Sequence, residues 1–170
     1  MFKHSYASDP TLGDRVFDLL EQVFPGVGQA RDNGVRFGVT WESVSTPYVH
    51  REGSRVLAHV GLMAMPLEVA GRPTVVGGVH GVATDPSARR RGLFRGLIEE
   101  LLADTAERFP TLMLTTLHRE YFEPFGFRVV PESIFRAQVA PRVGRPTARS
   151  LDLADPTDRA LMHRLLADPG

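Results

Sequence analysis

The 170-residue sequence contains no cysteine, and its 20 basic residues include a single lysine, Lys3. Without cysteine, the chain forms no disulfide, no catalytic thiolate and no cysteine-ligated zinc site. The basic residues are balanced by 20 acidic residues, and the resulting formal charge of zero excludes a protein whose main task is coating nucleic acid or an anionic membrane. No apolar run approaches the roughly 20 residues of a membrane span, and no apolar signal core follows Met1. We therefore expect a cytoplasmic protein.

The size and composition are those of one ordinary globular domain. The chain has a mass of 18.8 kDa, with 42% hydrophobic and 24% charged residues. Domains cluster at roughly 100 to 150 residues, so two independent cores are not expected.

Apolar periodicity switches between the two-residue repeat of strands and the 3.6-residue repeat of helices, which predicts an α/β fold. Strands are expected at 2–6, 48–51, 55–69, 74–84, 111–117 and 127–139. Helices are expected after the starts at 8–10, 85–87 and 155–158, where Asp-Pro pairs supply a cap and a first-turn proline. Residues 27–41 have a poor pattern, which allows either a second short helix or a loop. The proline- and arginine-containing stretch 141–146 is typical of a linker, which predicts a domain at 1–140 and a linker with a C-terminal helix at 141–170.

Three consecutive arginines stand where the strand at 74–84 gives way to the next helix. Arg89, Arg90 and Arg91 are followed by Gly92, and the apolar helical face begins directly afterwards. A helix N-terminus offers unpaired N–H groups and a partial positive charge, which together favour a phosphate or pyrophosphate. Cations in a first turn oppose the helix dipole, so the arrangement predicts either an anionic ligand or fully solvated side chains.

This segment carries a resemblance to a known family. The run Arg89 to Phe94, which follows Val82-Ala-Thr-Asp-Pro86, resembles the acyl-CoA-binding motif RxxGxG/A of the GCN5-related N-acetyltransferases (GNAT). A second signature of that family is similar to residues 121–127, YFEPFGF. The sequence pattern RRRGLxR is most similar to that of the subgroup of enhanced intracellular survival acetyltransferases. Phe94 departs from the family pattern, because Gly or Ala usually stands there, and this predicts a more crowded phosphate loop.

The resemblance implies a fold, a cofactor and a reaction. The fold would be a single domain with a mixed, splayed sheet and helices on both faces. The activity would be an N-acetyltransferase that moves an acetyl group from acetyl-CoA to a primary amine of a small molecule or peptide, without a metal. The cofactor contacts would come from Val82, Ala83, Thr84, Arg89, Arg90, Arg91, Gly92, Leu93, Phe94 and Arg95. Neither the phosphate loop GxxxxGK[ST] nor the dinucleotide motif GxGxxG occurs in the sequence.

His80 is the candidate general base. On a regular strand it would share a face with Val82 and Thr84, and its unperturbed pKa of about 6.5 suits proton transfer near neutral pH. The resemblance to arylalkylamine members of the family implies the same role at this strand position. A strand histidine bonded to a backbone carbonyl is an equally good interpretation of the sequence. His118 is a second candidate, and Glu120 and Glu123 could bind a cationic substrate or stay solvated.

Tyr121 is the candidate general acid. The family commonly places a tyrosine four residues before the glycine of its GF ending, and Phe122 occupies that position here. Either local geometry brings Tyr121 to the sulfur, or the thiolate leaves without a protein acid. Phe122, Phe125 and Phe127 are expected to pack in the core. Trp41, Tyr48 and Phe37 lie where the family builds its acceptor pocket.

Two alternatives remain open at this stage. The displaced tyrosine favours a non-catalytic acyl-CoA-binding module or regulatory relative, while nucleic-acid binding through the arginine run lacks interleaved aromatics. The C-terminal helix either packs on the core, exchanges between protomers of a homo-oligomer or is the remnant of a longer protein.

Overall fold

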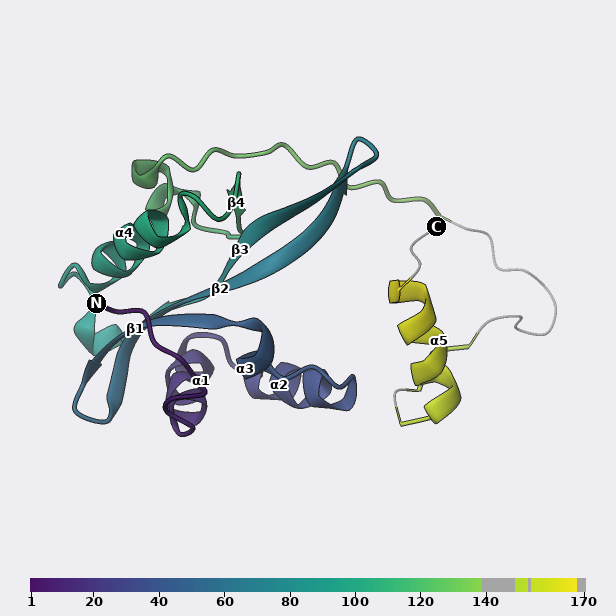
Figure 1. Cartoon of the computed structure of the whole chain (residues 1–170), viewed down its shortest axis with the longest axis horizontal. Helices are drawn as coiled ribbons and strands as arrows, with labels where there is room; N and C mark the ends of the chain where they lie inside the picture. The colour runs from purple at the N-terminus through teal and green to yellow at the C-terminus, as the bar shows by residue number, and fades with distance from the viewer. Residues whose placement is uncertain (139–148, 153, 168–170) are drawn as a thin grey trace. The chain divides into compact units, whose positions relative to one another are not determined.

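The computed structural model describes residues 1–138, 149–152 and 154–167, and the chain forms two units, Met1–Phe125 and Gly126–Gly170 (Figure 1). The expected linker at 141–146 and the expected boundary at residue 140 lie outside the described residues.

A four-stranded mixed sheet forms the centre of the first unit (Figure 1). Its strands, in spatial order, are β1 (Thr46–Glu52), β2 (Arg55–Val69), β3 (Arg72–Thr84) and β4 (Leu112–Met113). The first three pair in antiparallel fashion, while β3 and β4 are parallel. A parallel pair needs a crossover connection, and helix α4 (Leu93–Thr105) supplies it. The expected α/β class and mixed sheet are confirmed.

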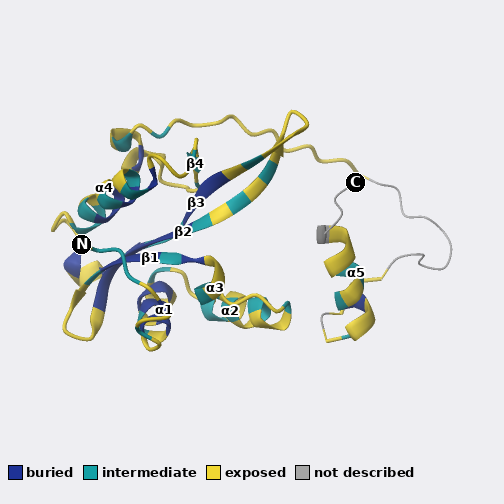
Figure 2. Ribbon diagram, viewed as in Figure 1, coloured by how far each residue is buried: buried dark blue, intermediate teal, exposed yellow. Residues whose placement is uncertain are grey.

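Helices cover both faces of this sheet. Helix α1 (Leu12–Val23) buries an apolar stripe that includes Leu12, Val16 and Leu20 against Val49 of β1 and Ala83 of β3. The shorter helices α2 (Val27–Arg36) and α3 (Trp41–Val44) follow it along the chain, whereas α4 lies on the opposite face (Figure 1). The stretches Val56–Leu62 of β2 and Val76–Val79 of β3 are buried, whereas the far end of this hairpin is largely exposed (Figure 2).

The N-terminal segment is held by α4 and does not form the expected strand over 2–6. Only Lys3 makes a bridge, to Tyr48 of β1. The Glu100 carboxylate of α4 accepts hydrogen bonds from the backbone N–H groups of Phe2 and Lys3, at 2.7 and 2.8 Å. The segment also exchanges two backbone hydrogen bonds with β1, from the His4 N–H to the Pro47 carbonyl and from the Val49 N–H to the Phe2 carbonyl, which make a single bridge and not a strand.

Strand β3 contains a bulge at Gly81 and Val82. The ladder pairs His59 with Ala83 and Gly61 with His80, so two residues of β3 stand opposite Val60. Gly81 has a left-handed backbone, with φ of 57°, a conformation that glycine adopts without steric cost. Because the extra residue shifts the alternation by one, His80 shares a face with Ala83, and Thr84 points to the other face. The expectation that His80, Val82 and Thr84 share one face is therefore wrong.

Strands β3 and β4 part soon after they meet. Their ladder consists of Gly77 with Leu112 and Gly78 with Met113, so the expected strand over 111–117 is much shorter than predicted. The contact is close, because a Cβ on Gly77 would lie 2.4 Å from the Leu112 side chain. Beyond Gly78, among the described residues, no strand pairs with β3 on this side. The expected splayed sheet is present.

The second unit contains helix α5 (Pro156–Ala167). The Asp158 carboxylate accepts two hydrogen bonds from the Arg149 guanidinium, at 2.6 and 2.7 Å. The described part of the strand expected over 127–139 is not a strand, and its side chains are exposed from Arg128 onward, with Phe135 at 94%. Its apolar composition signals β-propensity only, and Pro131 removes one N–H donor from any ladder. None of the helices in the described parts of the chain has the length and apolarity needed to cross a bilayer.

Candidate functional site

The turn that follows β3 is organised by Asp85. Its side chain is 2% exposed and accepts hydrogen bonds from the Ser87 backbone N–H at 2.9 Å and the Ser87 hydroxyl at 2.6 Å. It also forms an ion pair with Arg55 of β2. The hydrogen bonds from Ser87 and the charge of Arg55 lower the pKa of Asp85. This carboxylate ends the strand and begins a single 3₁₀ turn, η1 (Pro86–Ala88).

Two left-handed residues then turn the chain into α4. Arg90 has φ of 62° and Gly92 has φ of 77°, and α4 begins at Leu93. The three arginines therefore precede the helix, so the expected dipole penalty of cations in a first turn does not arise. Gly92 is the N-cap and provides no side-chain acceptor, and within the described residues no side chain caps the helix. The first-turn N–H groups of α4 are consequently open to an anion.

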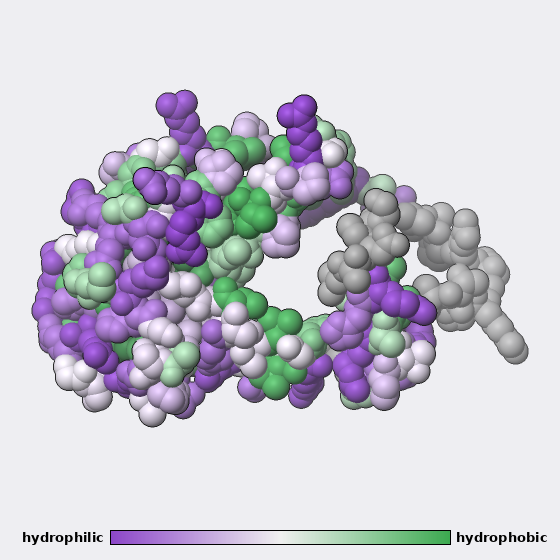
Figure 3. Space-filling view, viewed as in Figure 1, coloured by the Kyte–Doolittle hydropathy of each residue, from purple (hydrophilic) through white to green (hydrophobic). Residues whose placement is uncertain are grey.

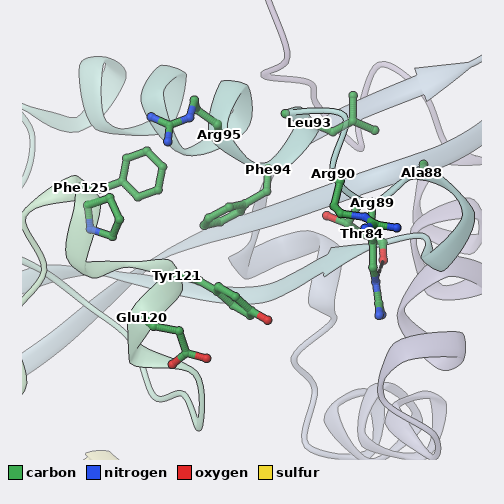
Figure 4. A pocket seen from close by; sticks show the side chains of 12 residues that line it. Thr84, Ala88, Arg89, Arg90, Leu93, Phe94, Arg95, Glu120, Tyr121 and Phe125 are labelled. Atoms are coloured by element: carbon green, nitrogen blue, oxygen red, sulfur yellow. Dashed lines mark hydrogen bonds between the residues drawn. The ribbon is translucent and has the colours of Figure 1, made fainter.

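An open cavity of about 340 Å³ lies at this turn. Its size is within the range of small-molecule sites. Figure 4 shows the side chains of Phe94 and Tyr121 extending into the space between α4 and the downstream turns. The cavity is lined by Thr84, Ala88, Arg89, Arg90, Gly92, Leu93, Phe94, Arg95, Glu120, Tyr121, Pro124 and Phe125. Most of the residues expected to bind a cofactor are therefore brought together here.

The side chains of two lining arginines, Arg89 and Arg95, contact neighbouring groups. The Arg89 side chain donates from Nε to the Thr84 carbonyl at 3.4 Å, and the Arg95 guanidinium lies 5.4 Å from the centre of the Phe125 ring. Arg90 lines the cavity, and no acidic partner for its guanidinium occurs among the described residues. An unpaired cation beside open N–H groups is a favourable setting for an anion.

Arg91 takes a different direction from its neighbours. Its guanidinium pairs with Glu52 at the end of β1, at 2.5 Å, and Arg91 does not line the cavity. Val82 and Ala83 do not line it either, and Ala83 is buried against α1. These three residues could therefore contribute to the site through their backbone only.

Aromatic rings form the opposite wall of the cavity. Tyr121 belongs to the turn η2 (Arg119–Tyr121), is 58% exposed and stacks on His118 with ring centres 5.4 Å apart. Phe122 is buried, as expected, and packs edge-on against Phe94 at 5.5 Å. Phe94 thus fills space between α4 and the turn η3 (Glu123–Phe125), where its ring also contacts Phe125 at 5.6 Å. The crowding expected from Phe94 is therefore present as part of the aromatic wall of the cavity.

His80 lies on the other face of β3, away from the cavity lining. Its ring contacts Trp41 of α3, with ring centres 4.6 Å apart, and covers Gly61 of β2. Both ring nitrogens are buried and lack a hydrogen-bond partner among the described residues. Burial lowers the pKa of His80 to about 4, so the expected value near 6.5 does not apply in this structure. The imidazole is neutral at physiological pH.

Trp41 is anchored on the same face, where its indole N–H donates to the Tyr6 hydroxyl at 3.1 Å. This position is consistent with a wall next to His80. Tyr48 is fully buried on the α4 face, and its hydroxyl donates to Asp104 at 2.6 Å. The expectation that Tyr48 lines an acceptor pocket is wrong, because its position in the β1 register turns it toward α4.

Sequence reasoning missed His59. This side chain is completely buried beside Trp41 and Gly81, and its strand neighbours are apolar, so no local pattern distinguishes it. The glycine that directly follows His80 was the available signal, because a glycine inside a strand often marks a bulge.

Together, these features define an α/β domain in which two parallel strands part and an uncapped helix follows the end of a strand. The acetyltransferase (GNAT) domain family matches residues 9–130, which is most of the chain. The chain belongs to this family of acyltransferases. The comparison with curated proteins gave no match.

Solved structures with low sequence identity share this fold. AAC(6′)-Iy, in complex with the bisubstrate analogue CoA-S-monomethyl-acetylneamine, has 16% identity and a TM-score of 0.57, over 81% of this chain and 96% of that chain. A predicted acetyltransferase from Clostridium acetobutylicum with acetyl-CoA has 16% identity and a TM-score of 0.56, over 79% and 93%. A probable N-acyltransferase from Enterococcus faecalis V583 has 16% identity and a TM-score of 0.59, over 73% of this chain. The chain spans 30% of the length of this last protein.

Proposed function

We propose that the protein transfers an acetyl group from acetyl-CoA to a primary amine of a small molecule or peptide. The observation that carries this proposal is the open start of α4 beside Arg90, at the end of a β3 edge that β4 leaves unpaired. The acetyl-CoA and CoA-analogue complexes of two proteins with the same fold support acetyl-CoA as the co-substrate.

The diphosphate of acetyl-CoA would be held by the turn before α4. The backbone N–H groups from Arg90 to Arg95 would donate to its oxygens, and the guanidinium groups of Arg89, Arg90 and Arg95 would neutralise its charge. Arg91 would contribute its backbone only, because its side chain pairs with Glu52. The pantetheine arm would then lie along Val82–Thr84 and add hydrogen bonds to the unpaired edge of β3.

The proposed reaction is direct attack of the amine on the thioester. The amine nitrogen bonds to the acetyl carbon, the carbon–sulfur bond breaks, and the CoA thiolate leaves with the electron pair. The acceptor also loses a proton, and His80 is the proposed base, in the neutral form that burial maintains. Tyr121 is the proposed acid for the thiolate. The two side chains lie on opposite faces of β3, so the proposed base would act from the α1 face and the proposed acid from the α4 face.

The comparisons support the family but not the subgroup of enhanced intracellular survival acetyltransferases. That subgroup stays a prediction from the sequence of the arginine motif. Binding along β3 and the acid and base roles are proposals of the same kind.

The test is release of free CoA thiol when the protein is incubated with acetyl-CoA and primary amines from several chemical classes. We expect amine-dependent thiol release by the wild-type protein and at least about a hundredfold loss in His80→Ala, the lower end of the effect typical of a lost base. Absence of thiol release with every amine, together with intact acetyl-CoA binding, would contradict the enzyme.

That contradicting outcome defines the second candidate function, a non-catalytic acyl-CoA-binding module. The separation of His80 from the cavity lined by Tyr121 is the observation that favours it. This module would bind acetyl-CoA and be indifferent to His80→Ala.

A further inference from the structure

His59 donates one hydrogen bond, and it goes to the bulge of β3. The side chain is completely buried, and its Nδ1 lies 2.6 Å from the Gly81 carbonyl oxygen. A carbonyl only accepts, so Nδ1 carries the proton. The other ring nitrogen, Nε2, is buried and has no partner among the described residues. Burial lowers the pKa of His59 to about 4, so the ring stays neutral while it makes this bond.

The Gly81 peptide links this bond to the candidate site. A peptide unit is planar, and no cis peptide occurs among the described residues, so the Gly81 carbonyl and the Val82 N–H point in opposite directions. A carbonyl turned toward His59 therefore directs the Val82 N–H away from the α1 face. Val82 begins the stretch of β3 along which the acyl arm is proposed to lie.

The surroundings hold the His59 ring in a single position. A Cβ built on Gly81 would meet His59 Cε1 at 3.2 Å and the Trp41 ring at 3.3 Å, so ring, bulge and indole are in close contact. The left-handed Gly81 backbone needs such support, since bulge conformations persist where surrounding contacts determine them.

We infer that His59 is a positioning residue, which fixes the Gly81–Val82 peptide so that the Val82 N–H is aimed at the acyl carbonyl. This inference rests on the proposed acetyl transfer. A fixed N–H donor directed at the carbonyl oxygen acts mainly as negative charge develops there, so its loss reduces kcat more than acetyl-CoA binding.

Three variants at His59 separate the hydrogen bond from packing. The amide nitrogen of asparagine occupies nearly the place of Nδ1, while glutamine places its amide nearer to Nε2 and leucine has no donor. We expect His59→Asn to keep kcat within about threefold of wild type, and His59→Leu and His59→Gln to lose about tenfold, the value of one hydrogen bond. The KM for acetyl-CoA should change less than about threefold in all three, because the arginine turn is untouched.

Thr105→Val is the matched control, because the buried Thr105 hydroxyl donates to the Leu101 carbonyl of α4 at 2.7 Å, far along the helix from the turn. It should lower the melting temperature without changing kcat. Equal loss of kcat in His59→Asn and His59→Leu, or wild-type kcat in His59→Leu, overturns the inference. If His59→Leu does not fold, the contrast between asparagine and glutamine decides.

A readout without turnover keeps this inference separate from the proposed function. Amide hydrogen exchange of Val82 and Ala83 should be close to wild type in His59→Asn and faster in His59→Leu, relative to the rest of β3. Failure of thiol release in the wild-type protein would overturn the proposed acetyl transfer, whereas unchanged exchange in His59→Leu would overturn the role of His59.

Discussion

The two faces of β3 at its bulge differ in charge, solvation and packing. On the α4 face, Arg90 and the uncapped start of α4 border an open cavity of about 340 Å³. On the α1 face, His59, His80 and Trp41 are packed together, and burial lowers the pKa of both imidazoles to about 4. One face suits an anionic ligand that stays partly solvated, and the other keeps its titratable groups neutral.

The difference shows how one strand can serve two tasks. A regular strand would place His80 and Thr84 on the same face, whereas the extra residue at the bulge sends them to opposite faces. The proposed phosphate contacts and the proposed base are thereby kept apart, and only the strand edge is common to both. Changes at the bulge should affect both faces, and changes on either side should affect one.

Gly81→Val should have the largest effect. A β-branched side chain at φ of 57° is strained, and its Cβ would press on His59 and Trp41. We expect a loss of about 2 kcal/mol or more in unfolding free energy and at least about a hundredfold loss of acetyl transfer. Urea denaturation and thiol release measure the two.

Gly92→Ala is the matched control for Gly81→Val. Gly92 is also left-handed, but a Cβ there would meet nothing within 4 Å. It should lose about 1 kcal/mol, from backbone strain alone. If the two substitutions proved equally costly, the bulge would not be the tightly packed position described above.

Acidification should destabilise the protein through the histidines of the α1 face. The unfolded chain takes up protons near the ordinary pKa of 6.5, while folded His59 and His80 do so near pH 4. The unfolded state therefore binds more protons in this window, and stability falls with decreasing pH. We expect each histidine to account for about 1.5 kcal/mol of the unfolding free energy lost between pH 6.5 and 5.

Urea denaturation of wild type and His80→Gln at several pH values measures this effect. The variant should have a shallower slope, because one of the two titrating imidazoles is gone. Identical slopes would mean that His80 is solvated in the folded protein.

Tyr121→Phe should have the smallest effect. The phenol lines the cavity and is 58% exposed, and a CoA thiolate is a good leaving group without a proton. We expect kcat to fall by less than about tenfold and acetyl-CoA binding to change little. Phe125→Leu, on the same wall, controls for lost aromatic packing. A loss of kcat of a thousandfold or more would make Tyr121 far more important than this account allows.

Much of the fold could be predicted because its main elements have clear local sequence patterns. The strand over 55–69 and the helix that follows the arginines have strong periodicity, and Asp85-Pro86 marks the turn between them. The strand expected over 127–139 failed because pairing is not encoded in the apolar content of a single segment. Residues 2–6 form one bridge with β1 instead of the expected strand, and Glu100 of α4 accepts hydrogen bonds from the N–H groups of Phe2 and Lys3.

The part of the site that depends on local charge and a glycine could be predicted from the sequence. The part that depends on the register of β3 could not. The arginines and Gly92 could be recognised because they precede an apolar helical face. The face of His80 could not, because the bulge at Gly81 reverses the alternation on which that prediction depended. His59 became apparent only once the fold brought it to the Gly81 carbonyl.

The most direct test of the central claim is calorimetric titration of acetyl-CoA into wild type, Arg90→Ala and Arg91→Ala. These neighbouring residues differ in direction, since Arg90 lines the cavity and Arg91 pairs with Glu52. We expect at least about a tenfold weaker affinity in Arg90→Ala, from one lost charge-assisted contact, and less than about a threefold change in Arg91→Ala. Equal affinities in all three proteins, or no binding to wild type, would contradict it.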